Sequence, residues 1–223
     1  AIRNYLVSQS SKEWILFIDG DLSLNNTRFI HNYLKAEGDV VVGGISIVED
    51  ENRWNNNLRY RYEHASKEAI SAKNRRKTPY QHLSTNFMAH RKLVGTTPYN
   101  EDIKQYGFED VLLGKRFKAL NAQINHIDNP VLFDDFELNA VFLRKTEEAL
   151  RTLSIFQTEL KGYSNLLEMA EKLRKMHISW VGVWLYKLLH KPLKHNLKGN
   201  NPSVFLFNIY KLIYFLHYNS IRK

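Results

Sequence analysis

Two aspartates lie one residue apart in the stretch FIDGDL, on either side of Gly20. They follow an apolar run, so we expect them at the carboxyl end of a buried strand, where open α/β sheets bind ligands. If the segment is extended, Asp19 and Asp21 point the same way. Their oxygens could then share Mg²⁺ or Mn²⁺, a hard cation that often keeps substrate phosphates in its shell. The alternative is an Asp-Gly turn that closes a strand and does no chemistry.

A second acidic pair, Glu109 and Asp110, lies in YGFEDVLLGKRF. Gly107 precedes the pair, and the pattern after it is that of an amphipathic helix. Both acids would then lie in the first helical turn, where negative charge complements the helix dipole. Taken alone, this motif indicates helix capping as readily as chemistry.

The elements that position these acids alternate along the chain. We expect strands at residues 13–18, 39–48, 84–90 and 123–127, and helices at residues 25–37, 52–73 and 107–120. Between them, Arg75, Arg76 and Lys77 are expected in a solvated basic loop. From about residue 137 onward the pattern is helical. The fold class is therefore α/β over residues 1–136, followed by an all-α extension over residues 137–223.

Together, in this order and 90 residues apart, the two acidic motifs resemble the family 2 glycosyltransferases, inverting enzymes with the GT-A fold. Residues 2–6 (IRNYL) look like that family's Arg-Asn helix. Residues 84–87 (STNF), followed by Arg91, are similar to its segment on the acceptor side. Residues 99–131 and 138–153 look like a bacterial branch with a helical C-terminal extension.

The resemblance implies a donor site for a nucleoside diphosphate sugar, with a UDP-sugar favoured. Asp21 would bind the divalent cation, Mg²⁺ or Mn²⁺, and Asp19 would bind the cation or the ribose. Arg3 would belong to the same donor site. The bound cation would stabilise the charge that grows on the leaving diphosphate.

The resemblance also implies an acceptor site. Asp110 would be the catalytic base, and Glu109 would orient the acceptor or cap the helix. Asn86 and Phe108 would contact the acceptor, a saccharide or a lipid-linked saccharide. The expected reaction is sugar transfer with inversion, for the synthesis of a surface polysaccharide or glycoconjugate.

Two departures from the family pattern shape the expectations. The family's first strands, which carry a base-binding aspartate, have no counterpart here, so we expect a GT-A sheet truncated at its N-terminus and a fragment that could be inactive. Many members also place a metal-binding histidine where this chain has Leu132-Phe133-Asp134-Asp135. Either Asp134 substitutes as an oxygen ligand or the cation relies on Asp21 and phosphate alone, and His126 is expected to be structural.

The basic excess of the chain lies in its last 63 residues. Residues 161–223 hold 11 Lys and Arg but only Glu168 and Glu171 as acids, against a net charge of +9 for the whole chain. Apolar and aromatic stretches there, with Pro192 and Pro202 placed between helices, favour a segment that lies on an anionic membrane surface. A helical lid on the catalytic domain is the alternative, and nucleic acid is a less favoured partner. The expected location is cytoplasmic, with attachment to the inner face of the membrane as an additional expectation.

Two other functions stay open. One is a metal-dependent nucleotidyltransferase of related fold, and the other is a non-enzymatic module that binds anions or membranes. The second would have no need of Asp19, Asp21 and Asp110. The chain has no cysteine, which excludes disulfides and thiolate metal sites.

Overall fold

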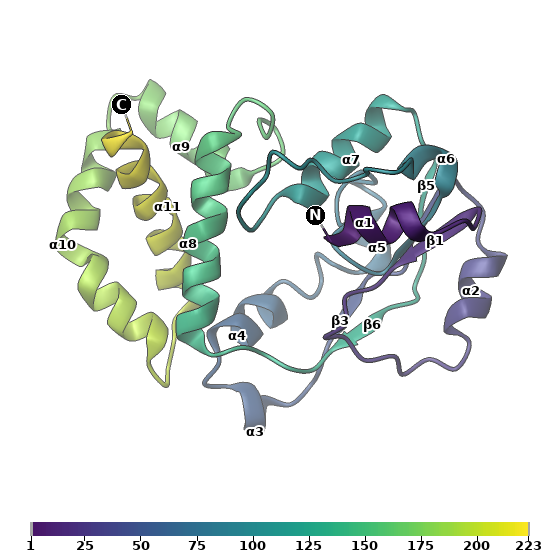
Figure 1. The fold of residues 1–223 in the computed structure, drawn as a ribbon. Helices are drawn as coiled ribbons and strands as arrows, with labels where there is room; N and C mark the ends of the chain where they lie inside the picture. Colours follow the sequence, from purple (N-terminus) through teal and green to yellow (C-terminus); the bar gives the residue numbers. More distant parts are fainter. Residues whose placement is uncertain (1, 223) are drawn as a thin grey trace. The chain divides into compact units, whose positions relative to one another are not determined.

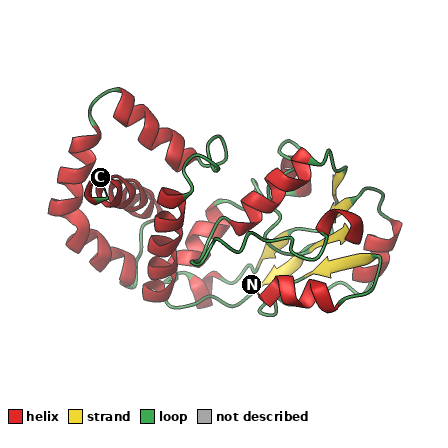
Figure 2. Cartoon of the chain, turned by 45° about the horizontal axis from the view of Figure 1, so that its top comes forward, coloured by secondary structure: helices red, strands yellow, loops and turns green. Residues whose placement is uncertain are grey.

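The chain folds as a mixed α/β protein with two compact units, which the computed structural model describes over residues 2–222 (Figure 1). The first, here called the sheet unit, comprises residues 1–49, 63–104 and 109–135. The second, the helical unit, comprises residues 50–62, 105–108 and 136–223. Figure 2 shows that all the yellow strands gather in one unit and that the other is built of helices. Two short segments from the first half of the chain thus belong to the helical unit.

The strands and short helices follow one another in the first 135 residues. The strands are β1 (Trp14–Phe17), β2 (Val40–Val42), β3 (Ile45–Ile47), β4 (Phe87–His90), β5 (Ile124–His126) and β6 (Val131–Phe133). The helices are α1 (Ile2–Gln9), α2 (Phe29–Lys35), α3 (Glu51–Trp54), α4 (Leu58–Ala65), α5 (Ala72–Arg75), α6 (Arg91–Val94) and α7 (Glu109–Ala119).

Four strands form a mixed sheet in the order β1-β4-β2-β5. β4 runs antiparallel to both of its neighbours, with Met88 opposite Val41, whereas β2 and β5 are parallel. The three valines of β2 are completely buried, as expected for a central strand. The expected strands are therefore present in shortened form. β3 and β6 form a separate parallel pair, and β6 was not predicted.

The long apolar run at residues 39–48 is broken by Gly43 and Gly44. A Cβ atom on Gly43 would lie 2.5 Å from the Asn86 amide and the Tyr33 hydroxyl, and one on Gly44 would lie 2.4 Å from the Arg75 guanidinium. Gly44 also has a φ of +85°, a conformation that favours glycine. Close packing at this point ends β2, so the predicted single strand is wrong.

The expected solvated basic loop is also wrong in part. Arg75 is buried and donates from Nη2 to the carbonyls of Gly43 and Ile127, at 3.0 and 2.9 Å. Arg76 donates from Nε to the carbonyl of His126 at 2.9 Å. Carbonyls at the ends of strands need donors when they are buried, and these guanidinium groups supply them.

Asn86 is completely buried at the centre of the same network. Its Nδ2 donates to the carbonyls of Gly44 and Asn129, at 2.5 and 2.9 Å, and its Oδ1 accepts from the Tyr33 hydroxyl at 2.6 Å. The residue also has a φ of +53°, which asparagine tolerates better than most residues. A side chain with no exposed surface cannot contact an acceptor sugar, so the role expected for Asn86 is corrected to a structural one.

We expect Asn86→Ala to lower the free energy of unfolding of the sheet unit by about 3 kcal/mol. The substitution leaves buried backbone carbonyls without donors and places alanine in a left-handed conformation. Asn100→Ala, at an exposed asparagine of the same unit, should cost less than about 1 kcal/mol. Denaturant unfolding of both variants checks this. Equal losses would show that the Asn86 network is not what holds β2, β4 and the 129–131 segment together.

Four longer helices build the helical unit. They are α8 (Asn139–Ile155), α9 (Asn165–Lys175), α10 (Ser179–Lys198) and α11 (Val204–Ile221). Pro192 lies inside α10, so the predicted helix break at this residue is wrong. Glu147 of α8 is buried and joins three helices: it accepts from the Tyr210 hydroxyl of α11 at 2.5 Å and from Lys194 Nζ of α10 at 2.8 Å. Over residues 2–222, no helix has the length and apolar character needed to cross a membrane.

Candidate active site

Asp19 and Asp21 lie just beyond the end of β1, in the sheet unit. β1 ends at Phe17, and Gly20 and Asp21 form a turn, so the segment is not extended as expected. Asp19 is half-buried, and its backbone N–H donates to Thr85 Oγ1 at 2.9 Å. Asp21 is exposed, and a Cβ atom on Gly20 would have nothing within 4 Å. The turn therefore presents its second carboxylate to open space.

Arg3 of α1 joins this turn to a buried tyrosine. Its Nη2 donates to Asp19 Oδ1 in a charge-assisted hydrogen bond. Its guanidinium carbon lies 5.3 Å from the centre of the Tyr99 ring, within the range of a cation–π contact. Both ionic side chains keep about a third of their surface exposed, at 31% for Arg3 and 38% for Asp19. The structure thus brings together two predicted donor-site residues from separate elements.

Tyr99 is a residue of the site that the sequence did not reveal. Asn4, the residue after Arg3, is buried, and its Nδ2 donates to the carbonyl of Tyr99 at 2.9 Å. In return the Tyr99 N–H donates to Asn4 Oδ1 at 3.0 Å. These two hydrogen bonds fix the loop that contains Tyr99 against α1. No local pattern signals this contact, because 95 residues separate the partners.

Asp110 and Glu109 open α7, as predicted. Burial raises the pKa of Asp110 to about 6, and the neighbouring Glu109 carboxylate adds to the rise. Hydrogen bonds from the backbone N–H groups of Val111 and of Asp110 itself act in the opposite direction, as does the charge of Arg3. Asp110 nevertheless keeps part of its surface accessible. It is therefore a carboxylate whose pKa lies near neutrality.

The two aspartates, the arginine and the tyrosine form one electrostatic cluster. Burial raises the pKa of Tyr99 to about 12, the charge of Arg3 opposes this, and the charges of Asp19 and Asp110 add to it. A single phenol thus lies within range of the carboxylate from the turn and the carboxylate from α7. We refer to Arg3, Asp19, Tyr99 and Asp110 as the acidic cluster.

No family model, curated protein or solved structure matches the chain. The chemistry of the acidic cluster therefore has to follow from its own residues.

Phe108, expected to contact the acceptor, belongs to the helical unit and is half-buried. It has a φ of +68°, directly after Gly107 with a φ of +105°. A Cβ atom on Gly107 would lie 2.8 Å from the Ala149 Cβ. A bulky residue in this conformation is unusual, and such strain gathers at functional sites. The acceptor role of Phe108 stays a prediction.

A divalent cation would find oxygen ligands but no complete site. Within residues 2–222, no group of three or more acidic or histidine side chains is arranged to hold a metal ion. Asp134, the expected substitute ligand, accepts a hydrogen bond from Ser23 Oγ at 2.8 Å. The turn carboxylates suit Mg²⁺ or Mn²⁺ by their chemistry, because such ions accept one or two carboxylates and take their other ligands from phosphates and water.

His126 is buried, as expected of a structural residue. Its Nε2 lies 2.9 Å from the carbonyl of Pro79, and it must therefore carry the proton of that hydrogen bond. Burial lowers the pKa of His126 to about 4. A neutral histidine enclosed beneath the 75–79 segment has its place in the core and not in a metal site.

Proposed function

We propose that the chain is the catalytic region and helical extension of an inverting glycosyltransferase that acts on a nucleoside diphosphate sugar. One observation carries the proposal: a carboxylate with a pKa of about 6, Asp110, lies in one electrostatic cluster with Arg3 and the Asp19 turn. Direct displacement at an anomeric carbon is helped by a base that accepts the proton of the attacking hydroxyl and by a cation that stabilises the leaving diphosphate. Asp110 would be the base, and the turn would hold the cation.

Asp110 is the proposed base. A sugar hydroxyl becomes acidic as it attacks the anomeric carbon, and a carboxylate within hydrogen-bond reach accepts its proton in the transition state. A raised pKa makes Asp110 a stronger proton acceptor than an ordinary aspartate, while it is still ionised at neutral pH. Glu109, beside it, keeps the pKa high through its own charge.

The turn and Arg3 are proposed to hold the donor. Asp21, which is exposed, and Asp19 would hold Mg²⁺ or Mn²⁺, and the bound ion would act as a Lewis acid toward the leaving diphosphate. Arg3 places a permanent positive charge beside the turn. Its bond to Asp19 fixes the orientation of that carboxylate before any ligand arrives.

The pH dependence of the reaction should reflect Asp110. The base must be ionised, so kcat/KM should fall by about tenfold per pH unit once the pH drops below about 6. An aspartate of ordinary pKa would keep its activity about two units further into acid. Measuring kcat/KM between pH 4 and 8 locates the pH below which activity falls, and Glu109→Gln should move this pH to a lower value. If the activity of the wild type falls only near pH 4, the assignment of Asp110 is contradicted.

The first experiment is a screen of donors. The protein is incubated with UDP-sugars, Mn²⁺ and saccharide acceptors, and released UDP is measured. Release that depends on acceptor supports the transferase. Pyrophosphate release from a nucleoside triphosphate and a sugar phosphate would favour a nucleotidyltransferase instead. No turnover in either assay would favour a binding module.

A further inference from the structure

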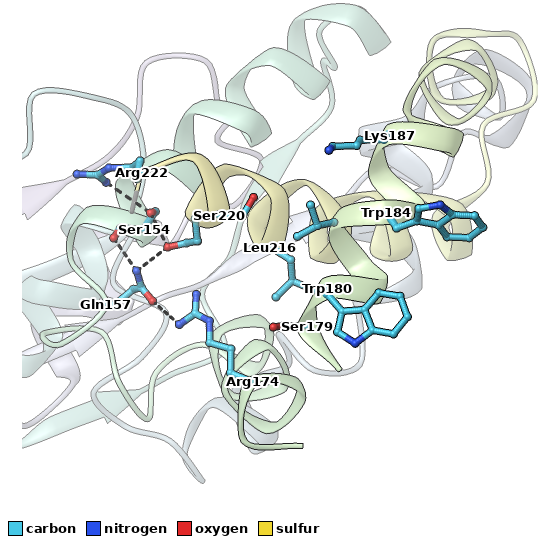
Figure 3. A pocket seen from close by; sticks show the side chains of 12 residues that line it. Ser154, Gln157, Arg174, Ser179, Trp180, Trp184, Lys187, Leu216, Ser220 and Arg222 are labelled. Carbon is cyan, nitrogen blue, oxygen red and sulfur yellow. Dashed lines mark hydrogen bonds between the residues drawn. The ribbon is translucent and has the colours of Figure 1, made fainter. Parts of the chain in front are cut away.

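A second site lies within the helical unit and shares no residue with the acidic cluster. Side chains from α8, α9, α10, α11 and the segments next to them line an open pocket of about 700 Å³ (Figure 3). That volume falls in the range of small-molecule sites. The proposed catalytic residues do not line it, so binding in this pocket can be measured without turnover.

The lining of the pocket is positively charged. Arg174, Lys187 and Arg222 line it, and no Asp or Glu does. Over residues 2–222, no carboxylate forms an ion pair with any of these three side chains, although other cations of the unit are paired, such as Lys194 with Glu147. Three uncompensated cations around one cavity favour an anion as its occupant.

The pocket also contains a connected set of polar groups. Arg174 Nη1 donates to Gln157 Oε1 at 2.9 Å, and Gln157 Nε2 donates to Asn219 Oδ1 at 2.8 Å. Ser154 Oγ donates to the same Asn219 oxygen at 2.9 Å. Figure 3 shows this chain of bonds running from Arg174 to Arg222 along one wall. The guanidinium of Arg174 is thereby held in place before a ligand binds.

The rim of the pocket is aromatic and exposed. Trp180 and Trp184, one helical turn apart on α10, are 66% and 56% exposed, and their indoles project outward beside the cavity (Figure 3). Leu188, the next residue along this face, is 59% exposed. Indoles beside cationic side chains suit the boundary between lipid headgroups and acyl chains. A soluble anion would gain nothing from this apolar rim.

We propose that this pocket binds the phosphate of an anionic phospholipid in a membrane surface, with Trp180 and Trp184 inserted at the level of the headgroups. Arg174, Lys187 and Arg222 neutralise the phosphate, and the indoles supply the apolar contact. The pocket would thus add one specific phosphate-binding site to the non-specific attraction between the basic residues 161–223 and an anionic membrane.

The experiment measures partition of the full chain onto vesicles of phosphatidylcholine with increasing phosphatidylglycerol. The test variant combines Lys187→Gln with Arg222→Gln, both exposed residues. The control combines Arg144→Gln with Lys198→Gln, which are exposed residues of the same unit that do not line the pocket. Removing two charges that line the pocket should weaken partition about thirtyfold, whereas removing two charges that do not line it should change partition less than about threefold.

Two further arms separate the sources of the anion. Trp180→Ala with Trp184→Ala should weaken partition at least about tenfold, whereas Phe205→Ala, at an aromatic residue of α11 that is 71% exposed and does not line the pocket, should not. Tryptophan emission should shift to shorter wavelength on vesicles in the wild type and not in the Trp variant. Inorganic phosphate at constant ionic strength should leave vesicle binding unchanged.

The proposal is overturned if the two charge variants lose affinity equally, which would mean diffuse attraction without a pocket. It is also overturned if the wild type does not bind anionic vesicles, or if inorganic phosphate releases the wild type from them but does not release the Lys187/Arg222 variant. A third contrary result would be that a single-stranded oligonucleotide binds the wild type and loses affinity for the same variant to the same extent as the vesicles do. Because none of these measurements needs turnover, failure here and failure of the transferase proposal are distinguishable.

Discussion

The substitution Asp110→Asn is expected to lower turnover at least about a hundredfold and to leave the affinity for the nucleotide sugar nearly unchanged. A general base acts in the transition state, so its loss appears in kcat and not in donor binding. Asparagine has nearly the same shape as aspartate, and its amide oxygen can still accept from the backbone N–H groups that the Asp110 carboxylate meets, including that of Val111. The loss should therefore come from the missing base and not from unfolding.

Asp102→Asn is the matched control for this change. Asp102 is an exposed aspartate of the same unit, and its replacement should leave turnover within about twofold of the wild type. Steady-state kinetics and donor titration on both variants separate the two parameters. Near-normal turnover in the Asp110 variant would assign the proton to Glu109 or remove the base from the mechanism.

The second large effect is expected at the turn. Asp21→Ala should abolish the dependence of donor binding on Mn²⁺, because it removes the carboxylate that the turn presents to solvent. Asp21 is exposed and the space around Gly20 is open, so the substitution should not disturb the fold. Calorimetric titration of a UDP-sugar with and without Mn²⁺ measures the effect.

Asp135→Ala controls for the loss of one negative charge from the sheet unit. Asp135 is also an exposed aspartate, and we expect its replacement to preserve the gain in affinity that Mn²⁺ provides. If the Asp21 variant keeps that gain as well, the turn does not hold the cation.

The strands of the four-stranded sheet and the positions of the two acidic motifs could be predicted because their signals are local, whereas β6 and the break between β2 and β3 were not predicted. The valines of β2 form a continuous apolar run, and Glu109 and Asp110 lie in the first turn of α7 as their position after Gly107 indicated. That Arg3 and Asp19 belong to one donor site was expected only from a resemblance, and their direct contact was not predicted, since 16 residues and a strand separate them.

The features that could not be predicted from the sequence depend on contacts between residues that are far apart along the chain. Nothing near Asn86 shows that its amide joins Gly44 to Asn129, and nothing near Arg75 shows that it fills the space beside Gly44. Each is a polar residue, for which exposure is the usual expectation. Both are buried because the broken strand leaves carbonyls that need donors.

In the basic C-terminal extension, too, the sequence did not reveal which residues lie together. The count of lysines and arginines was enough to locate the positive charge, but the pocket draws Arg174, Lys187 and Arg222 from three different parts of the chain. Only the packing of the helices brings them around one cavity.

The most direct test of the central claim is the configuration of the product. If Asp110 activates the acceptor for direct displacement, the anomeric centre inverts, and an α-linked UDP-sugar yields a β-linked product. Proton NMR of the product measures this through the anomeric coupling constant. We predict the β-linked product; an α-linked product would contradict direct displacement and the role proposed for Asp110.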